Sequence, residues 1–324
     1  MNRDALKARF RQQVNQPIDL SRLYKLGRNG KRASVFVGQK IRVDIAAAFA
    51  RAGFLEPGLI GEVYDAVCGG WLNEKITATS VTPKDIRRPE KPDGLWDAYW
   101  SVAEDAIAGE LDAAGITART AHLGGLMGED YLKATAEAAR EYPKVTSMEG
   151  SAPPPKITLE TLAACPNGSL GREFHDMIVD NKFDLEVLDR DEIGLSDLPQ
   201  PLNYLNTRIL QAHDLWHIVA GYDTTALHEI AISAFQMAQF GHPYSAQFLS
   251  VMGAVGALSP RIGYGVLMTS ISTAWLHGRK TPPLILIDWE KEWEKSPQAI
   301  RDEFGIELYK SPYPADLIEK RLAA

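Results

Sequence analysis

The apolar residues of this chain recur at the spacing of α-helices and hardly ever at the spacing of β-strands. One clear example is a stripe along a single helical face: Leu95, Trp96, Tyr99, Ala103, Ala106, Ile107 and Leu111. A stripe of this kind is more often core than cofactor site, and we expect it to be core. Runs in which β-branched and polar residues alternate are scarce. The pattern therefore predicts an all-α protein, folded as a multi-helix bundle.

Composition narrows the class of protein further. A length of 324 residues allows one large domain or two ordinary ones, and 45% hydrophobic with 24% charged residues is typical of soluble globular proteins. Cys68 and Cys165 are too few for a disulfide framework and lack metal-type spacing, which favours a reducing compartment. No apolar run reaches the roughly 18 residues of a membrane span, and no signal-peptide core follows the first basic residues, so we expect neither.

Charge is distributed unevenly along the chain. Residues 1–43 contain eleven Lys and Arg against two Asp, a balance of +9, so a net charge of −7 leaves −16 for the rest. Basic arms of this kind bind anionic lipid or nucleic acid, or simply stay solvated. We expect a solvated arm or a contact with an anionic membrane surface. No nucleic acid is expected, because no basic motif with interleaved aromatic residues accompanies the arm.

A proline run marks the best candidate boundary. The segment Ser151-Ala152-Pro153-Pro154-Pro155 excludes helix and stiffens the backbone. We therefore expect a basic N-terminal arm (1–43), a helical region (44–150) and a C-terminal domain (156–324). The role of the middle region stays open between a family extension, a lid and an oligomer contact such as a homodimer interface.

One predicted helix carries three candidate metal ligands. A helix advances about 100° per residue, so His213, Asp214 and His217 share one face. Leu215 and Trp216 point elsewhere and are free to pack. Two imidazoles four residues apart with an interleaved carboxylate are much more specific than a lone buried histidine. The spacing predicts a metal site on this face.

A fourth candidate ligand follows a turn. Gly221 can end the first helix, and Thr224 or Thr225 can cap the next, which then presents Glu229 in its first turn. Glu229 lies four residues after Thr225, which is not the position of a capping-box glutamate. Imidazoles and carboxylates without cysteine suit zinc, or a non-haem iron or manganese.

Alternatives remain within this motif. Asp214 could orient an imidazole instead of binding the metal, since metal-bound histidines commonly donate their other N–H to a carboxylate. His228 points about 100° away from Glu229 and is not expected to be a ligand. We expect neither a zincin protease, whose His-Glu-x-x-His motif uses the glutamate as general base, nor a His-Asp phosphohydrolase, which needs separate upstream and downstream ligands.

The motif and three further stretches resemble one known family. His-Asp-x-x-His, eleven residues and Glu form a pattern similar to the signature of the coenzyme Q (ubiquinone) biosynthesis protein four family (Coq-four). The other stretches that resemble this family are Pro166–Phe174, His277–Pro283, and Trp289–Glu294 leading to Glu303–Ile306. The resemblance covers about residues 159–306.

The resemblance implies an activity and a cofactor. It implies a ubiquinone biosynthesis protein that carries out metal-dependent, oxidative decarboxylation at the ring carboxyl of a polyprenylated hydroxybenzoate, as a carbon–carbon lyase. His213, Asp214, His217 and Glu229 would hold one divalent metal, zinc before iron or manganese. The alternative is a non-catalytic lipid- or quinone-binding scaffold that organises the biosynthetic complex around a structural zinc, although structural zinc sites are more often cysteine-rich.

The resemblance also implies partners and a location. The expected partners are a polyprenylated quinone precursor, other ubiquinone biosynthesis proteins and an anionic membrane surface. A bacterial version would be cytoplasmic and peripheral at the inner membrane, and a eukaryotic one would lie at the mitochondrial matrix face.

Two glycine-containing apolar segments could hold the tail of such a substrate. Phe248–Leu258 and Ile262–Leu276 read as buried core helices, and only the resemblance favours an isoprenoid tunnel between them. Likewise, the Gly168–Gly171 turn reads as the start of a helix, and the resemblance favours a site-lining role. The expected substrate contacts are Gly168, Ser169, Arg172, Phe235, Met252 and Tyr264. We expect Trp289–Arg301 to form an exposed amphipathic helix.

Overall fold

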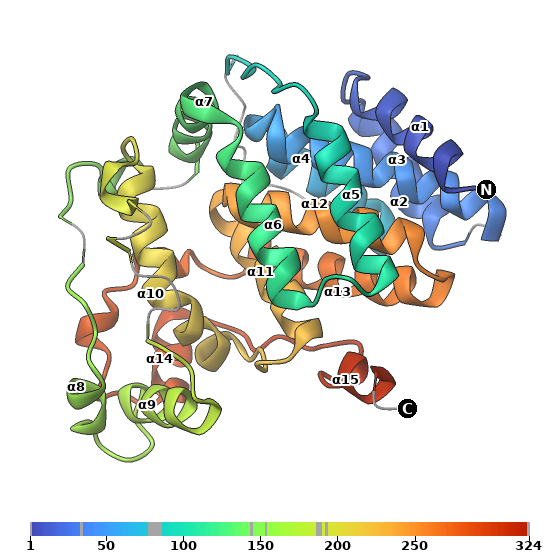
Figure 1. Cartoon of the computed structure of the whole chain (residues 1–324). Helices are drawn as coiled ribbons and strands as arrows, with labels where there is room; N and C mark the ends of the chain where they lie inside the picture. The colour runs from blue at the N-terminus through green and yellow to red at the C-terminus, as the bar shows by residue number, and fades with distance from the viewer. Residues whose placement is uncertain are drawn as a thin grey trace. The chain divides into compact units, whose positions relative to one another are not determined.

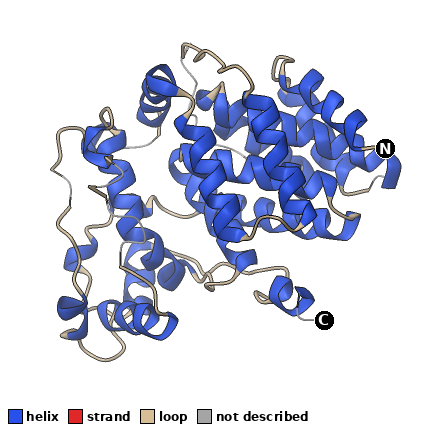
Figure 2. Ribbon diagram, in the orientation of Figure 1, coloured by secondary structure: helices blue, strands red, loops and turns tan. Residues whose placement is uncertain are grey.

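Helices make up all of the regular structure in the part of the chain that the computed structural model describes (Figures 1 and 2). This part comprises residues 2–32, 35–76, 86–142, 145–152, 154–185, 190–191 and 194–322, so Pro153 of the expected boundary lies outside it. The α-helices are α1 (Arg3–Val14), α2 (Leu20–Gly30), α3 (Val35–Phe54), α4 (Ile60–Leu72), α5 (Leu95–Ala108), α6 (Ala113–Gly125), α7 (Gly128–Arg140), α8 (Leu159–Ala163), α9 (Leu170–Asn181), α10 (Leu202–Ala220), α11 (Ala226–Phe240), α12 (Pro243–Leu258), α13 (Arg261–Lys280), α14 (Pro297–Phe304) and α15 (Leu317–Leu322). Short 3₁₀ turns are η1 (Pro57–Leu59), η2 (Val145–Met148), η3 (Leu195–Asp197), η4 (Leu284–Leu286) and η5 (Trp289–Lys291). The all-α prediction is confirmed.

The helices gather into two compact units, each built from distant parts of the sequence. Unit 1 comprises Met1–Tyr142, Thr225–Arg279 and Ser311–Ala324, and unit 2 comprises Pro143–Thr224 and Lys280–Lys310. The chain passes from unit 1 into unit 2 shortly before the proline run. No helix in the described residues is both long enough and apolar enough to cross a membrane.

Helix α12 is the centre of unit 1. It packs against α3, α5, α6 and α11. Its contact with α3 is close because small residues line it: a Cβ on Gly53 would lie 3.1 Å from the Ala246 carbonyl, and Gly253 faces Ala46. Gly256 similarly faces Leu267 of α13. Gly253 and Gly256 of the first predicted apolar segment therefore allow close helix packing, whereas Gly263 and Gly265 of the second have no neighbour closer than 3.9 Å to a Cβ position.

The segment expected as a basic arm is built into the core of unit 1. Residues 3–43 form α1, α2 and the start of α3, and Leu6, Phe10 and Val14 of α1 are buried. The Phe10 ring stacks on Tyr99 of α5 with their centroids 5.0 Å apart, and meets Trp96 edge-on at 5.9 Å. This confirms that the aromatic stripe of α5 is core. Its partner is the N-terminal helix.

Unit 2 corrects one expectation. The stretch Trp289–Arg301 is not an exposed amphipathic helix: it contains η5 and then α14, which begins at Pro297. Trp289 is fully buried, and Trp293 stacks on Phe174 of α9 at 6.4 Å. The prediction was wrong because Trp293 packs this irregular backbone on α9, and burial of the two tryptophan rings outweighs the helical charge pattern.

Truncation of Phe10 tests whether the N-terminal helices belong to the core. We expect Phe10→Ala to lower the free energy of unfolding by about 3–5 kcal/mol, measured by chemical denaturation, because a fully buried ring leaves a cavity. Leu20→Ala is the control: Leu20 is 37% exposed, and its loss should change stability by less than about 1 kcal/mol. A detachable arm would give no difference between the two variants.

Candidate metal centre

Helix α10 in unit 2 presents the three ligands predicted on one face. Leu215 and Trp216 are buried, as expected from their positions on the helix, and hold it against the rest of the unit. His213 and Asp214 are partly buried and His217 is almost fully buried. One ligand atom from each of these three side chains lies within 4.8 Å of the others. The predicted convergence of His213, Asp214 and His217 is present.

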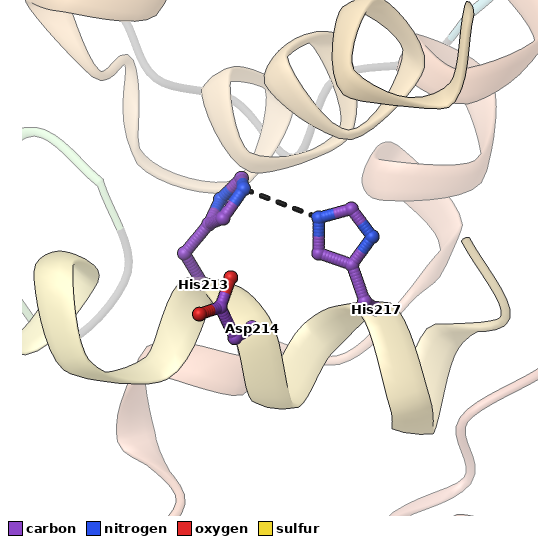
Figure 3. Close-up of side chains that lie close together, drawn as sticks. All are labelled: His213, Asp214 and His217. Atoms are coloured by element: carbon purple, nitrogen blue, oxygen red, sulfur yellow. Dashed lines mark hydrogen bonds between the residues drawn. The ribbon is translucent and has the colours of Figure 1, made fainter. Parts of the chain in front are cut away.

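The two imidazoles point their Nε2 atoms at each other (Figure 3). The Nε2 atoms are 3.2 Å apart, with the rings nearly perpendicular and their centroids 4.9 Å apart. Nitrogen donors about 2.0–2.1 Å from a tetrahedral zinc lie about 3.3 Å from one another. The distance between the two Nε2 atoms thus suits a hydrogen bond when no cation is bound, and it suits two ligands of one cation when a cation is bound. Within the described residues, no other group of three His, Cys, Asp or Glu side chains converges in this way.

A backbone carbonyl fixes the orientation of the His217 ring. The Nδ1 atom of His217 lies 3.0 Å from the Tyr222 carbonyl oxygen. Because a carbonyl oxygen only accepts, Nδ1 carries the proton, and the neutral ring then has its lone pair on Nε2, facing His213. Metal-bound histidines are commonly oriented by this kind of second contact. The donor types of the three residues and the tautomer of His217 therefore fit a divalent metal, and His213 would give up its Nε2 proton on binding it.

Gly221 makes that contact possible. As predicted, it ends α10 in the left-handed conformation, with φ of 80°, and the N–H groups of Gly221 and Tyr222 both donate to the His217 carbonyl. The resulting turn brings the Tyr222 carbonyl to the Nδ1 atom of the His217 ring. A Cβ on Gly221 would lie only 2.9 Å from the Leu308 side chain. This position accepts no larger residue without a shift.

The ring of Tyr222 anchors the turn. It stacks on Tyr309 with centroids 4.5 Å apart, and the Tyr309 N–H donates to the Ala220 carbonyl at 2.8 Å. Burial, and secondarily the neighbouring Tyr309, raises the pKa of Tyr222 well above its usual range. The phenol therefore stays neutral, and Tyr222 serves the site through its carbonyl. The residue types around the motif did not indicate a role for Tyr222, although the predicted helix end at Gly221 could have pointed to it.

An ion pair between buried Arg208 and partly exposed Glu290 holds the other half of α10. Arg208 donates to the Glu290 carboxylate at 2.6 and 2.9 Å and to the Ile287 carbonyl at 2.9 Å. Arg208 is 3% exposed, so removing Glu290 would leave a buried charge without its main partner. The pair ties α10 to the segment around η4 and η5. The ion pair positions α10, and the local spacing of residues in the sequence did not predict it.

Glu229 lies in unit 1, in the first turn of α11, as its place in the sequence predicted. Thr225 is at the N-cap, but its hydroxyl donates to the Ala315 carbonyl at 2.9 Å. The Ala226 N–H is instead accepted by the Glu319 carboxylate of α15, at 2.8 Å. The cluster formed inside unit 2 thus contains three of the four expected ligands. The role of Glu229 as the fourth stays a prediction.

The expected substrate contacts of the Gly168 turn have structural partners. Ser169 caps α9 by accepting the Arg172 N–H at 3.3 Å, and Gly168 has φ of 76°. The N–H groups of Leu170 and Gly171 donate to the carbonyls of Lys295 and Trp293. The Arg172 side chain pairs with Asp176 at 3.0 Å. These contacts explain why the turn forms here, as the start of α9. A contact between this turn and a substrate stays a prediction.

Unit 1 contains an apolar pocket between the helices of the two predicted segments. Its volume is about 180 Å³, and it is lined by residues of α11, α12, α13 and α15: Leu227, Ile230, Met252, Val255, Gly256, Ser259, Gly263, Val266, Leu267, Leu317, Ile318 and Arg321. Met252, an expected substrate contact, lines this pocket. Phe235 and Tyr264 do not. Phe235 is buried beside His277, and Tyr264 beneath Arg42.

Comparison with known proteins gives consistent results. The family model described as coenzyme Q (ubiquinone) biosynthesis protein Coq4, the Coq-four family named above, matches residues 127–310, beginning earlier than the motifs suggested. The mitochondrial ubiquinone biosynthesis protein COQ4 homologue of Drosophila melanogaster is 30% identical over 190 residues, 57% of this chain and 68% of the relative. The Aedes aegypti homologue is 29% identical over 156 residues, 48% of this chain and 54% of the relative. The chain thus spans about half to two thirds of the length of these relatives.

A solved structure shares the fold. It is a crystal structure of a protein from Nostoc punctiforme that is provisionally described as a ubiquinone biosynthesis protein. The TM-score is 0.50 at 25% identity, and the superposition covers 66% of this chain and 97% of the other. The two proteins therefore share most of the smaller one's architecture.

Substitution of Gly221 tests the link between the turn and the metal centre. Gly221→Ala forces a Cβ into left-handed backbone, which costs about 1–2 kcal/mol of stability, and moves the Tyr222 carbonyl. We expect metal affinity, measured by competition with a chelator, to fall about 10–100-fold. Gly109→Ala is matched: Gly109 ends α5 with φ of 78° and has no neighbour within 4 Å of its Cβ position. It should lose similar stability and keep its metal, and equal metal affinity in both variants would contradict the link.

Proposed function

Because this chain belongs to the coenzyme Q (ubiquinone) biosynthesis protein Coq4 family, we propose that it removes the ring carboxyl of a polyprenylated hydroxybenzoate in a metal-dependent, oxidative decarboxylation. The observation that carries the proposal is the convergence of the His213, Asp214 and His217 ligand atoms. The Nδ1 atom of His217 is hydrogen-bonded to a carbonyl, which orients the imidazole ring. A metal ligand needs such an orientation, whereas a helix face that is merely polar does not.

The residues of α10 have distinct roles in this proposal. With a metal bound, His213 and His217 would each offer an Nε2 lone pair, and the Asp214 carboxylate supplies negative charge to the same face, either as a ligand or beside one. The role of Glu229 as a further ligand stays a prediction from the sequence. His217 keeps its proton at Nδ1, on the Tyr222 carbonyl, so the ring is not free to act as a proton donor from that atom. A bound divalent metal would supply Lewis acidity, or oxygen chemistry if it is iron.

The overall reaction balances with dioxygen as oxidant. The bond between the ring carbon and the carboxyl carbon breaks and the carboxyl leaves as CO₂. One oxygen atom of O₂ becomes the new ring hydroxyl, and the other becomes water with two electrons and two protons from an external reductant. The substrate carboxylate and its neighbouring phenolic oxygen would bind at the three-residue cluster, because carboxylate and phenolate oxygens are suitable ligands for such metals.

The apolar pocket of unit 1 is the proposed site for part of the isoprenoid tail. Its lining is mainly aliphatic, and Gly263, whose Cβ position has no neighbour closer than 3.9 Å, leaves room that a larger side chain would fill. Burial of a hydrocarbon chain there contributes about 0.8 kcal/mol per CH₂ group. Arg321 is the charged residue of the lining.

The second candidate function is a lipid-binding scaffold with a structural zinc. The same pocket favours it, because lipid binding requires no chemistry. The two candidates differ in what the metal does: a scaffold needs it for folding alone, whereas the enzyme needs it for turnover. Structural zinc sites are closed by four protein ligands and are usually cysteine-rich, which favours the enzyme.

Turnover by the metal-loaded protein tests the reaction. We expect metal-replete wild type to release labelled CO₂ from an authentic precursor labelled at the ring carboxyl, under air and with a reductant. His217→Ala should reduce this rate at least about 100-fold, because it removes a ligand. His122→Ala, at an exposed imidazole of α6, is the control and should keep full activity. Metal-replete wild type that leaves the precursor unchanged would rule out the enzyme and favour the scaffold.

A pair of glycine variants tests the tail site. Gly263 lines the pocket and its Cβ position has no neighbour closer than 3.9 Å, so Gly263→Leu should fill the pocket without disturbing α13. We expect binding of a fluorescent prenyl alcohol to weaken about tenfold, since leucine would displace at least two CH₂ groups of the ligand. Gly265→Leu, on the same helix but outside the pocket lining, should bind like wild type. Equal binding by the two variants would exclude this pocket.

A further inference from the structure

The C-terminal helix α15 forms one wall of the apolar pocket in unit 1. Leu317, Ile318 and Arg321 of this helix line the pocket, opposite residues of α11, α12 and α13. Helix α15 lies outside residues 127–310, so this wall comes from a part of the chain beyond the family match. The family match therefore does not account for how the pocket is closed on this side.

This wall is held less firmly than the others. Helix α15 has six residues, and helices of fewer than about 12 residues are not stable on their own in water. The segment 311–316 that leads to it contains no helix or strand (Figure 1). Leu317 and Ile318 are only partly buried, whereas α12 contributes fully buried residues such as Val251 to the core. Elements with few buried contacts open locally at a low free energy, so α15 is the wall that is most easily displaced.

Two hydrogen bonds fasten α15 to the start of α11. The Thr225 hydroxyl donates to the Ala315 carbonyl at 2.9 Å, and the Ala226 N–H donates to the Glu319 carboxylate at 2.8 Å. The Ala226 N–H belongs to the first turn of α11 and has no partner within that helix, and a carboxylate is favourable at the positive end of the helix dipole. We call these two bonds the α15 latch.

The residue at the start of α11 has a second partner available when the latch opens. Thr225 is the N-cap residue and has the extended backbone typical of that position, with φ of −112° and ψ of 157°. Its hydroxyl nevertheless makes no capping hydrogen bond, because it is turned toward Ala315. Once α15 leaves, rotation of the Thr225 side chain lets its oxygen accept an N–H of the first turn of α11. This bond offsets part of the cost of opening.

We propose that α15 is a lid on the apolar pocket, which opens at the α15 latch to admit a hydrocarbon chain and then closes over it. This inference rests on the proposed tail site, because the lid covers that same pocket. A bound chain adds apolar contact to Leu317 and Ile318 only in the closed arrangement. A ligand that binds one of two arrangements better shifts the population toward it, so the chain favours closure.

Hydrogen–deuterium exchange on the full-length protein tests the lid without any ligand. The backbone amides of residues 317–322 should exchange much faster than those of α12. Glu319→Ala should speed exchange in α15 about tenfold, because it removes a hydrogen bond to a charged group, and should leave α12 unchanged. Glu129→Ala removes an exposed glutamate from the first turn of α7 and is the matched control, with exchange in α15 as in wild type. Exchange in α15 as slow as in α12, in wild type and in Glu319→Ala, would make α15 a fixed wall and overturn the proposal.

Binding kinetics test whether the lid controls entry. Glu319→Ala should raise the association rate constant of a fluorescent prenyl alcohol about tenfold, measured by stopped flow, because the open arrangement becomes more populated. Glu129→Ala should associate like wild type, and the bound alcohol should slow exchange in α15. An unchanged association rate in Glu319→Ala would overturn the lid. Equal binding by Gly263→Leu and Gly265→Leu would instead refute the tail site, and exchange in the ligand-free protein would still decide whether α15 opens.

Discussion

The hydrogen bond between His217 Nδ1 and the Tyr222 carbonyl is the contact on which the candidate site depends. It sets which nitrogen of the ring carries a proton and aims the other at His213. The bond exists because Gly221 turns the chain back on itself and because Tyr222 stacks on Tyr309. The end of α10 thus becomes the part that orients the candidate metal centre.

Close contacts at small residues also position the helices of unit 1. Close approach of α3 and α12 at Gly53, and of α2 and α4 at Gly27, leaves little freedom in how these helices rotate. Asp44, almost fully buried, receives two arginines from the N-terminal helices.

Local periodicity predicted the helical class, the face shared by His213, Asp214 and His217, and the end of α10 at Gly221, because each depends on residues a few positions apart. It failed where the deciding contact is distant in sequence. The Trp289 segment follows a helical charge pattern, yet the burial of its tryptophan decides its irregular backbone. The N-terminal helices were expected as an arm because their aromatic partner, α5, lies far along the chain. The role of Tyr222 could not be predicted from residue type, because it depends on a backbone carbonyl, which every residue has.

The most direct test of the central claim is the metal content of protein purified without chelators, for wild type beside His217→Ala and Glu229→Ala. The account predicts about one equivalent of zinc or iron in wild type and its loss in the His217 variant. Loss in the Glu229 variant as well would establish the fourth ligand, and retention there would leave a three-residue site on α10. Metal-free wild type, or a His217 variant that keeps its full metal content, would contradict the account, and the cluster would then be a polar face of α10 that binds no metal.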